Sequence, residues 1–315
     1  MSTRPGLPVR LSASPGIRLC FDLECTMSNT MSKTIAILAP GAMGSAVARR
    51  LGEHGARVLT SLNGRSEATR KRAADAGMIG AEDDAIADAD IILSIVPPGE
   101  AVALAERLAG LIVRREKKPV VVDCNAVNVD TVMRIEEIIG SAQAPFVDAG
   151  IIGFPPQPGG KSPAFYMSGE HAKDVAVLKD FGLDVRIVEG PVGAASALKM
   201  SYAGIVKGLA GIGSAMVVAA TKAGAADALR DELARSQPAV LARLEVALPD
   251  MIPKAYRWVA EMREISGFLG PDHPASQVYE GFARWFEHLA EDAKGDAADT
   301  DLMKAFAAGI AQKKS

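Results

Sequence analysis

The sequence predicts an α/β domain with a doubly wound parallel sheet, followed by an all-α helical domain. Three observations carry this prediction. From residue 34 to about residue 190, short apolar runs alternate with segments whose apolar residues recur at helical spacing. These runs are continuous, as in strands of a parallel sheet that is covered by helices on both faces. Beyond Gly190 the strand signal disappears, and helical segments continue to the C-terminus.

Size and composition limit the function classes. A chain of 315 residues with 49% hydrophobic residues can build a core in each of two domains. The formal net charge of −3 disfavours nucleic acid or an anionic membrane as a partner. The odd cysteine count (Cys20, Cys25 and Cys124) favours free thiols in a reducing cytoplasm. A metal site is disfavoured because no histidine or further cysteine lies near Cys20 and Cys25.

Residues 1–33 are expected to form a disordered N-terminal extension. They contain several prolines and glycines and lack the continuous apolar segment of a signal peptide or a membrane anchor. Met27 or Met31, just before the first strand, is an alternative start of the functional protein.

The first ordered element is a strand over residues 34–38, followed by a glycine-bearing turn and a helix. Such a turn brings backbone N–H groups and the helix dipole to one point, where they attract a phosphate. Gly41 lets the main chain approach a pyrophosphate, and Gly44 lets the helix pack closely on the sheet. Ala39 stands where the G-x-G-x-x-G pattern has its first glycine. An ordinary strand–helix turn is therefore the alternative interpretation.

The second strand, residues 57–62, ends without the acidic residue that binds the ribose 2′-hydroxyl of NAD. Arg65 and Ser66 beyond its end instead suit a 2′-phosphate, which favours NADP over NAD. The alternative is that Arg65 merely caps a solvated loop. The expected contacts at this tip are Asn63, Arg65 and Ser66, with Arg70 or Lys71 as a further cation.

Further strands and helices alternate to residue 188. Strands are expected at 78–79, 91–96, 120–123, 146–149, 164–167 and 185–188, and helices at 99–109, 129–139 and 172–181. Val96 and Pro97 end one strand on the side where such sheets bind ligands.

The helical part begins with an Ala- and Gly-rich apolar stretch, residues 194–223. Its uncharged run, 208–221, is too short to span a bilayer, so we expect a buried helix and no membrane partner. Glycines within it lower helix propensity, which makes sense if another helix packs very close. Tyr279, Phe282 and Phe286 recur at helical spacing and predict a helical core or a subunit interface. The acidic segment 291–301 is expected to be a solvated loop.

Four separated segments together resemble the β-hydroxyacid dehydrogenase and 6-phosphogluconate dehydrogenase superfamily, with matching order over about residues 34–225. They are Ala39 to Gly44, Asp123 to Val127, Val147 to Gly153 and Ala197 to Met200. Residues 199–203, Lys-Met-Ser-Tyr-Ala, are similar to an uncharacterised branch with a phosphogluconate-dehydrogenase-like C-terminal domain. The resemblance implies a Rossmann domain at 34–190 and a helical substrate and dimerisation domain at 191–315. It also implies a small-molecule substrate and a homodimer.

The resemblance implies roles residue by residue. Gly41, Ala42, Met43 and Gly44 would hold the pyrophosphate, and Val96 and Pro97 would border the cofactor. Asn125 takes the place of a serine that contacts substrate. Lys199 matches the general acid of carbonyl reduction, which is the base of alcohol oxidation. The expected substrate contacts are Gly150, Ile151, Ile152 and Gly153.

Two departures from the family bear on the substrate. The Ser-Gly-Gly segment that grips a carboxylate is Ile152-Gly153-Phe154 here, and the asparagine four residues beyond the lysine is Ala203. A carboxylate would lose a hydroxyl donor, so the site is expected to prefer a bulkier or less polar molecule.

A physical argument for Lys199 stands beside the resemblance. A lysine in a long apolar helix is costly unless it is paired or functional, and partial burial lowers its pKa toward the range useful for proton transfer. Tyr202, on the same face, is expected to orient the substrate or relay a proton. Lys207 is expected to depress the pKa of Lys199 further or to bind an anion. In the alternative, both lysines reach solvent. Cys124, beside the substrate motif, is expected to be a buried structural thiol.

These observations predict an NADP-dependent oxidoreductase that moves a hydride between a nicotinamide and a hydroxyl or carbonyl carbon. Lys199, Asn125 and Tyr202 are the expected catalytic residues. The alternatives are imine reductase-like C=N reduction and a non-catalytic NADP-binding protein.

Overall fold

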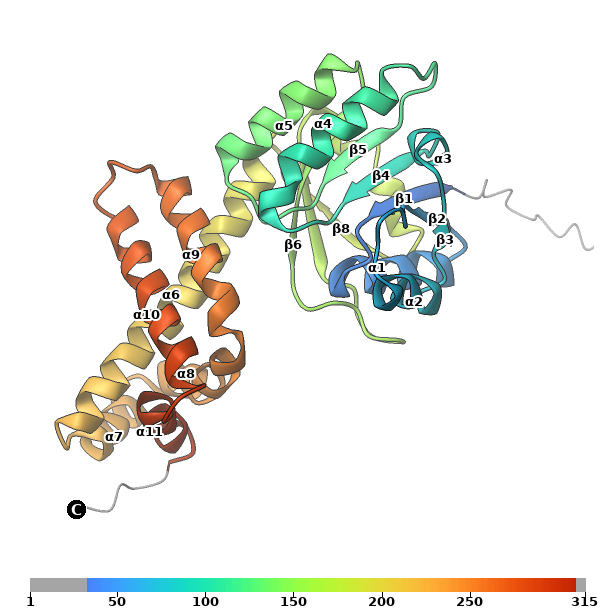
Figure 1. Ribbon diagram of the computed structural model, residues 1–315. Helices are drawn as coiled ribbons and strands as arrows, with labels where there is room; N and C mark the ends of the chain where they lie inside the picture. The colour runs from blue at the N-terminus through green and yellow to red at the C-terminus, as the bar shows by residue number, and fades with distance from the viewer. Residues whose placement is uncertain (1–32, 310–315) are drawn as a thin grey trace, which may run out of the picture. The chain divides into compact units, whose positions relative to one another are not determined.

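The computed structural model describes residues 33–309, which form a sheet covered by helices and then a group of helices around a long one (Figure 1). The expected α/β domain and all-α region are both confirmed. The expected extension 1–33, with Cys20, Cys25 and the two alternative starts, lies outside the described residues except for Lys33.

The sheet has eight strands in the order β3-β2-β1-β4-β5-β6-β7-β8. They are β1 Thr34–Leu38, β2 Arg57–Thr60, β3 Ile79–Gly80, β4 Ile91–Ser94, β5 Val120–Asp123, β6 Phe146–Ile152, β7 Ala164–Ser168 and β8 Asp184–Ile187. Strands β1 to β6 are parallel, as predicted. Strand β7 runs antiparallel to β6, and β8 follows the direction of β7. The predicted parallel sheet is therefore confirmed for most of its pairs, and the one antiparallel pair arises because the β6–β7 connection contains no crossover helix.

Helices cover both faces of this sheet (Figure 1). They are α1 Ala42–Glu53, α2 Glu67–Asp75, α3 Asp83–Ala87, α4 Ala101–Ile112 and α5 Val129–Ser141, with a 3₁₀ turn η1 at Pro98–Glu100. Strand β1 shows why the strands are continuously apolar. Ile35 and Ile37 pack in the core on the α1 side, whereas Ala36 and Leu38 pack in the core of α4 and α5.

The helix expected over 172–181 is wrong. The chain forms two 3₁₀ turns instead, η2 Glu170–Lys173 and η3 Ala176–Lys179. The buried residues of this stretch, Ala172, Val175 and Leu178, recur every three residues, which is the period of a 3₁₀ helix.

The C-terminal part is all-helical. It contains α6 Ala194–Lys222, α7 Ala226–Ser236, α8 Pro238–Met251, η4 Ile252–Lys254, α9 Ala255–Leu269, α10 Ser276–Asp292 and α11 Ala298–Ala307. The close packing predicted for α6 is confirmed. A Cβ on Gly211 would lie 2.7 Å from the ring of Phe282, and one on Gly204 would lie 3.0 Å from the hydroxyl of Tyr279. Phe286 is fully buried, so the three aromatic residues belong to a helical core.

Helix α6 extends well beyond the uncharged run 208–221, which is too short to span a bilayer. With 29 residues it is, in the described part of the chain, the one helix long and apolar enough to cross a membrane. Length and composition are weak evidence for a span, because the core helix of a globular domain has the same properties. Residues of α6 pack into one core with α8, α9 and α10.

The acidic segment 291–301 also differs from the expected solvated loop. Helix α10 extends to Asp292 and α11 begins at Ala298. Asp299 is only 6% exposed and forms ion pairs with Lys222 and His288.

Candidate active site

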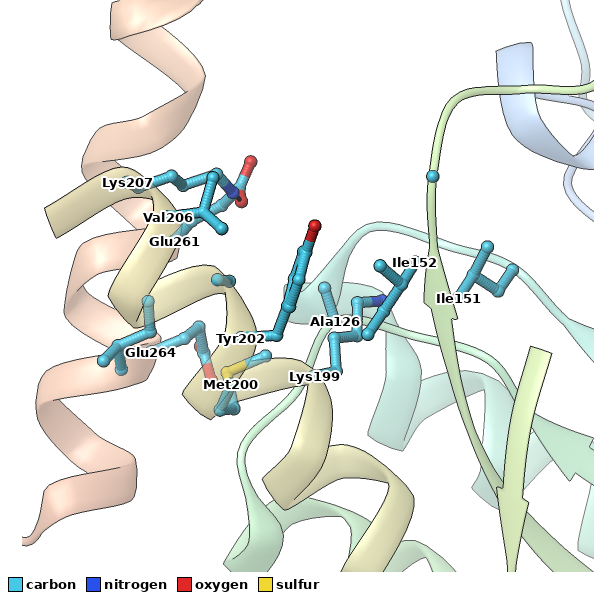
Figure 2. A pocket seen from close by; sticks show the side chains of 13 residues that line it. Ala126, Ile151, Ile152, Lys199, Met200, Tyr202, Val206, Lys207, Glu261 and Glu264 are labelled. Atoms are coloured by element: carbon cyan, nitrogen blue, oxygen red, sulfur yellow. Dashed lines mark ion pairs between the residues drawn. The ribbon is translucent and has the colours of Figure 1, made fainter. Parts of the chain in front are cut away.

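A cavity of about 310 Å³ lies over one face of α6, beside the end of β6, the loop after β5 and helix α9 (Figure 2). Its lining residues are Ala126, Ile151, Ile152, Gly153, Lys199, Met200, Tyr202, Ala203, Val206, Lys207, Glu261, Glu264 and Ile265. The sequence prediction that Lys199 and Tyr202 share one face of a helix is confirmed, and Ala203 and Val206 of the same helix also line the cavity.

The amine of Lys199 lies at the sheet end of this cavity. In Figure 2 the side chain points between Ala126 and Ile152. Its Nζ donates a long hydrogen bond of 3.5 Å to the backbone carbonyl of Asn125. Burial lowers the pKa of Lys199, and the negative charges of Asp123 and Asp148 oppose this effect. The pKa of Lys199 is therefore lowered by burial, as its place in an apolar helix predicted.

Gly150 lets α6 lie directly against β6. A Cβ at this position would lie 2.8 Å from the carbonyl oxygen of Ala195 and 3.1 Å from Cβ of Lys199. A side chain there would push the helix, and Lys199 with it, away from the strand. Gly150 thus acts behind the lysine and does not line the cavity, whereas Ile151, Ile152 and Gly153 do.

The buried carboxylate of Asp148 fixes the start of α6. It accepts hydrogen bonds from the backbone N–H of Gly193 at 3.0 Å and of Ser196 at 2.9 Å. The hydroxyls of Ser196 and Ser168 donate to it at 2.6 and 3.1 Å. A negative charge at a helix N-terminus also interacts favourably with the helix dipole. Lys199 lies about one turn beyond Ser196, so the hydrogen bonds between Ser196 and Asp148 fix the position from which the Lys199 side chain extends.

The side chain of Asn125 is committed to the ends of neighbouring strands. Its Oδ1 accepts from the backbone N–H of Val96 at 2.7 Å, and its Nδ2 donates to Ser94 at 2.8 Å and to Asp123. The backbone carbonyl of Asn125 therefore faces Lys199, whereas its side-chain amide is used in hydrogen bonds to the strand ends.

Asp123, to which the sequence assigned no role, is a buried acid of the same network. Burial raises its pKa to about 7, and the charge of Asp148 adds to that effect. Hydrogen bonds from Asn125 and the charge of Lys199 oppose it. Its position directly before Cys124 and Asn125 was the available sequence signal. Cys124 is buried, and its burial raises the pKa of the thiol, as expected for a structural cysteine.

Tyr202 and Lys207 lie further along the cavity. Tyr202 is 50% exposed and borders the opening. The amine of Lys207 contacts the carboxylate of Glu261 and lies 5.4 Å from the ring centre of Trp258. Burial and the charge of Lys199 lower the pKa of Lys207 to about 8, whereas the carboxylate contact opposes deprotonation. A pKa of about 8 and the contact with Glu261 both leave Lys207 charged at neutral pH. Its side chain is only 17% exposed, so the alternative that this lysine simply reaches solvent does not hold.

Helix α9 supplies three cavity residues that the sequence did not point to, the acidic Glu261 and Glu264 and the apolar Ile265. Glu264 accepts the backbone N–H of Asn128 at 3.2 Å, and burial raises its pKa. Nothing in the local sequence could have identified them, because α9 lies some sixty residues beyond Lys199 and carries no motif.

The turn between β1 and α1 has the geometry of a phosphate site. A Cβ on Gly44 would lie 2.5 Å from the carbonyl oxygen of Ala39, so close packing requires this glycine. Gly41 has a φ of −73°, and a Cβ there would meet nothing within 4 Å. The fold therefore gives no reason for a glycine at 41. No side chain caps α1, and the N–H groups of its first turn, at Ala42 and Met43, have no partner within the helix.

A second hollow of about 230 Å³ lies at the ends of β1, β2 and β4. It is lined by Leu38, Ala39, Ser61, Arg65, Val96, Glu100, Ala103, Leu104 and Arg107. The sequence singled out Arg65 and Val96 but missed Arg107, which pairs with Asp83.

The other residues expected at this tip have partners within the protein. The amide of Asn63 donates to Glu82 at 3.1 Å, and Ser66 caps α2 by accepting from the N–H of Thr69 at 3.3 Å. The proposed further cations are also engaged. Lys71 pairs with Asp75 at 2.8 Å, and Arg70 donates to the carbonyl of Arg65 at 3.2 Å. Pro97 is exposed just after Val96.

Comparison with known families and structures supplies independent information. Residues 34–180 match the NAD binding domain of 6-phosphogluconate dehydrogenase, and residues 220–289 match a domain of unknown function, DUF1932. An uncharacterized 28.5 kDa protein of the 7S RNA 5′ region of Methanothermus fervidus is 32% identical over 184 residues. That alignment covers 57% of this chain and 68% of the relative.

Solved structures share the fold over most of the chain. The conserved protein MTH1747, of unknown function and similar in structure to 3-hydroxyacid dehydrogenases, has a TM-score of 0.68 at 25% identity, covering 83% of this chain and 98% of its own. Mycobacterium tuberculosis 3-hydroxyisobutyrate dehydrogenase with L-serine has a TM-score of 0.68 at 18% identity, covering 89% and 100%. An imine reductase variant from Myxococcus stipitatus with NAD+ has 0.56 at 17% identity, covering 88% and 99%.

Proposed function

Because the chain belongs to the β-hydroxyacid dehydrogenase and 6-phosphogluconate dehydrogenase superfamily, we propose that it is an NADP-dependent oxidoreductase. It would transfer a hydride between the nicotinamide and the hydroxyl or carbonyl carbon of a small, hydroxyacid-like organic substrate. The observation that carries the proposal is the placement of the Lys199 amine in a cavity at the ends of β5 and β6. Ligands of doubly wound sheets bind at this end of the strands.

The chain's own residues suit a dinucleotide. Gly41 leaves open space in front of the uncapped N-terminus of α1, where Ala42, Met43 and Gly44 present backbone N–H groups to a pyrophosphate. Arg65 borders the neighbouring hollow, and no acidic residue ends β2. These two features support NADP, because a guanidinium pairs with a 2′-phosphate and a carboxylate would bind the 2′-hydroxyl of NAD.

Lys199 is proposed as the proton donor and acceptor. When bound, the cofactor supplies or accepts the hydride, and the protein supplies orientation and a proton. Lys199 would protonate the carbonyl oxygen during reduction and would take the hydroxyl proton during oxidation. Burial lowers the pKa of Lys199, and this shift is toward the range in which an amine can both give and take a proton. Asn125 would hold the amine through its carbonyl, and Tyr202 would orient the substrate at the cavity opening.

The walls of the cavity support a substrate with an apolar portion. Ile152, Ala203 and Val206 line the cavity together with Lys199 and the Lys207–Glu261 pair. Since Glu261 already pairs with Lys207, a substrate anion would have to compete with this carboxylate for the lysine.

The experiment is a substrate screen that follows NADPH or NADH oxidation with aldehydes, semialdehydes, oxo acids and cyclic imines. Lys199→Met is expected to lower turnover of the best carbonyl substrate about 100-fold or more with unchanged NADPH affinity. Lys179→Met, at an exposed position of the sheet domain, is the matched control and should retain full activity.

Three outcomes would contradict the proposal. Equal turnover by wild type and Lys199→Met would exclude the lysine as acid. Tight NADPH binding without oxidation of any substrate would indicate a non-catalytic binding protein. Faster turnover of imines than of carbonyls would indicate C=N reduction, the chemistry named for the Myxococcus stipitatus neighbour.

We further propose that the protein acts as a homodimer in the cytoplasm, with α6 at the interface. Exposed apolar residues of α6 recur at spacings of four, three, seven and four, as on one face of helices that pair with one another. They include Leu198, Tyr202, Ile205, Ile212 and Met216. Ile205, which is 72% exposed, is the best probe. Light scattering should give a dimer for the wild type and a monomer for Ile205→Glu. A monomeric wild type would refute this part.

A further inference from the structure

We infer that Asp123 is a positioning residue for Lys199: its carboxylate holds the turn whose carbonyl binds the lysine amine, and its negative charge stabilises the ammonium form. The effect of Asp123 on catalysis rests on the proposed function, but the link between Asp123 and Lys199 does not. It assigns a role to a buried acid that the proposed reaction does not otherwise use.

A chain of hydrogen bonds connects the two side chains. Asp123 is the last residue of β5, and its Oδ2 accepts from the backbone N–H of Asn125 at 3.3 Å. Its Oδ1 accepts from Nδ2 of Asn125. The carbonyl of Asn125 in turn accepts from Nζ of Lys199 at 3.5 Å. The carboxylate therefore determines the direction in which this carbonyl points.

The two buried acids near Lys199 differ in how their charges are satisfied. Asp148 on β6 accepts four hydrogen bonds, two of them from the N-terminal turn of α6, whose dipole also favours a negative charge. Asp123 is 2% exposed, and both donors that reach it belong to Asn125. An ionised carboxylate with so few donors needs a compensating cation. Lys199 is the cation whose charge acts on it.

The remaining charged groups around Lys199 do not replace Asp123. Cys124, directly after β5, is buried, and its raised pKa keeps the thiol neutral. Lys207 on α6 repels a second ammonium, and Glu261 of α9 is already paired with Lys207. Glu264 of α9 faces the N–H of Asn128. Asp123 is thus the acid best able to keep Lys199 protonated.

The state of Asp123 changes near neutral pH. Burial raises its pKa to about 7, so above this pH the carboxylate is charged and supports the ammonium of Lys199. Below it the carboxyl group is neutral and this support is withdrawn. Replacing Asp123 by a neutral residue removes the support at every pH and must lower the pKa of Lys199.

The test measures the pKa of Lys199 without any substrate. The full-length protein is labelled with trace acetic anhydride over a pH series, and acetylation of the peptide containing Lys199 is quantified by mass spectrometry. Asp123→Asn is expected to lower the labelling pKa by about one unit or more relative to wild type. Asp123→Ser, whose hydroxyl can still accept from the N–H of Asn125, is a second neutral variant should the first not fold.

Ser94→Ala is the matched control. It removes a hydrogen bond to Nδ2 of Asn125 without removing a charge, so it should leave the labelling pKa in place. With an active substrate, the alkaline limb of the pH profile of carbonyl reduction should move to lower pH in Asp123→Asn and stay in Ser94→Ala.

Each result has one meaning. An unchanged labelling pKa in Asp123→Asn and Asp123→Ser, or an equal shift in Ser94→Ala, overturns the inference. A shift confined to the Asp123 variants supports it. A shift in a protein that turns over no substrate would support the link between Asp123 and Lys199 while refuting the proposed enzyme activity.

Discussion

Two helix N-termini of this protein meet the sheet, and the same electrostatics serves a different purpose at each: α1 directly follows β1, whereas α6 begins beside β6, a strand far from it in sequence. At the β1–α1 junction, the helix N-terminus has no side-chain cap, and a Cβ on Gly41 would meet nothing within 4 Å. At the β6–α6 junction, the carboxylate of Asp148 accepts the N–H groups of Gly193 and Ser196. Both helix N-termini favour an anion. The β1–α1 junction is open to an anion from outside, and we call it the open junction. The β6–α6 junction is occupied by the carboxylate of Asp148, and we call it the closed junction.

A binding turn and a structural turn differ in the space around their glycines. A glycine that the packing requires, such as Gly44 or Gly150, has neighbours that a Cβ would strike. A glycine with open space in front of it and ordinary backbone angles, such as Gly41, is not explained by the fold. Variants at the two junctions should therefore separate stability from cofactor affinity.

The largest effect is expected at the closed junction. Asp148→Ala leaves buried donors of Gly193, Ser196 and Ser168 without an acceptor, and it should lower the free energy of unfolding by about 3–5 kcal/mol. Urea denaturation followed by circular dichroism measures this. Asp130→Ala, at an exposed aspartate in the first turn of α5, is the control and should cost less than about 1 kcal/mol. Equal losses in the two variants would refute the capping role.

Gly150→Ala should have the next largest effect. Its Cβ would lie 2.8 Å from the carbonyl of Ala195, so α6 must shift, at a cost of about 1–3 kcal/mol. Because Lys199 moves with the helix, turnover should fall more than NADPH affinity does. Gly140→Ala, where a Cβ meets nothing within 4 Å, provides the comparison for unfolding and kinetics. A fall in NADPH affinity as large as the fall in turnover would contradict this account.

Gly41→Ala should separate binding from stability at the open junction. The added methyl group occupies the space in front of α1, so the Kd for NADPH should rise about tenfold, which corresponds to about 1.4 kcal/mol. Unfolding free energy should change by less than about 0.5 kcal/mol. Gly44→Ala should instead destabilise the fold, because its Cβ would lie 2.5 Å from the carbonyl of Ala39. Unchanged NADPH affinity in Gly41→Ala would place the pyrophosphate elsewhere.

Ala39→Gly should have the smallest effect, and in the stabilising direction. Ala39 has a φ of +70°, in the left-handed region that glycine adopts without steric cost. Glycine there should raise the unfolding free energy by about 1 kcal/mol. Ala42→Gly, in the first turn of α1, should lower it by about 0.5–1 kcal/mol. Destabilisation by Ala39→Gly would show that the positive φ carries no strain.

The sequence predicted the strands and most helices because each leaves a local period. The continuous apolar runs of β1 and β4 predicted strands buried on both faces, and the glycines of α6 predicted close packing. The 3₁₀ turns at Glu170–Lys173 and Ala176–Lys179 were not predicted, because over ten residues the period of 3.0 of a 3₁₀ helix differs little from the period of 3.6 of an α-helix. The reversal of β7 escaped because the period within a strand carries no information on its direction.

For the candidate site, the sequence singled out Lys199 and Tyr202 on one helix face, with Lys207 partly round the same side, since a helix fixes which neighbours share a side. It did not identify Glu261 as the partner of Lys207, nor the carbonyl of Asn125 as the partner of Lys199. Those pairs join separate elements and depend on how the elements pack.

By itself, then, the amino-acid sequence determined the kinds of elements, their order and the family, because periodicity and motifs are properties of contiguous residues. The tertiary structure alone decided which buried charges meet. The approach of α6 to β6 at Gly150 brings Lys199 near Asp123 and Asp148, and the approach of α9 brings Glu261 to Lys207. Electrostatic interactions act through space over a few ångströms, and that distance is set by packing and not by position along the chain.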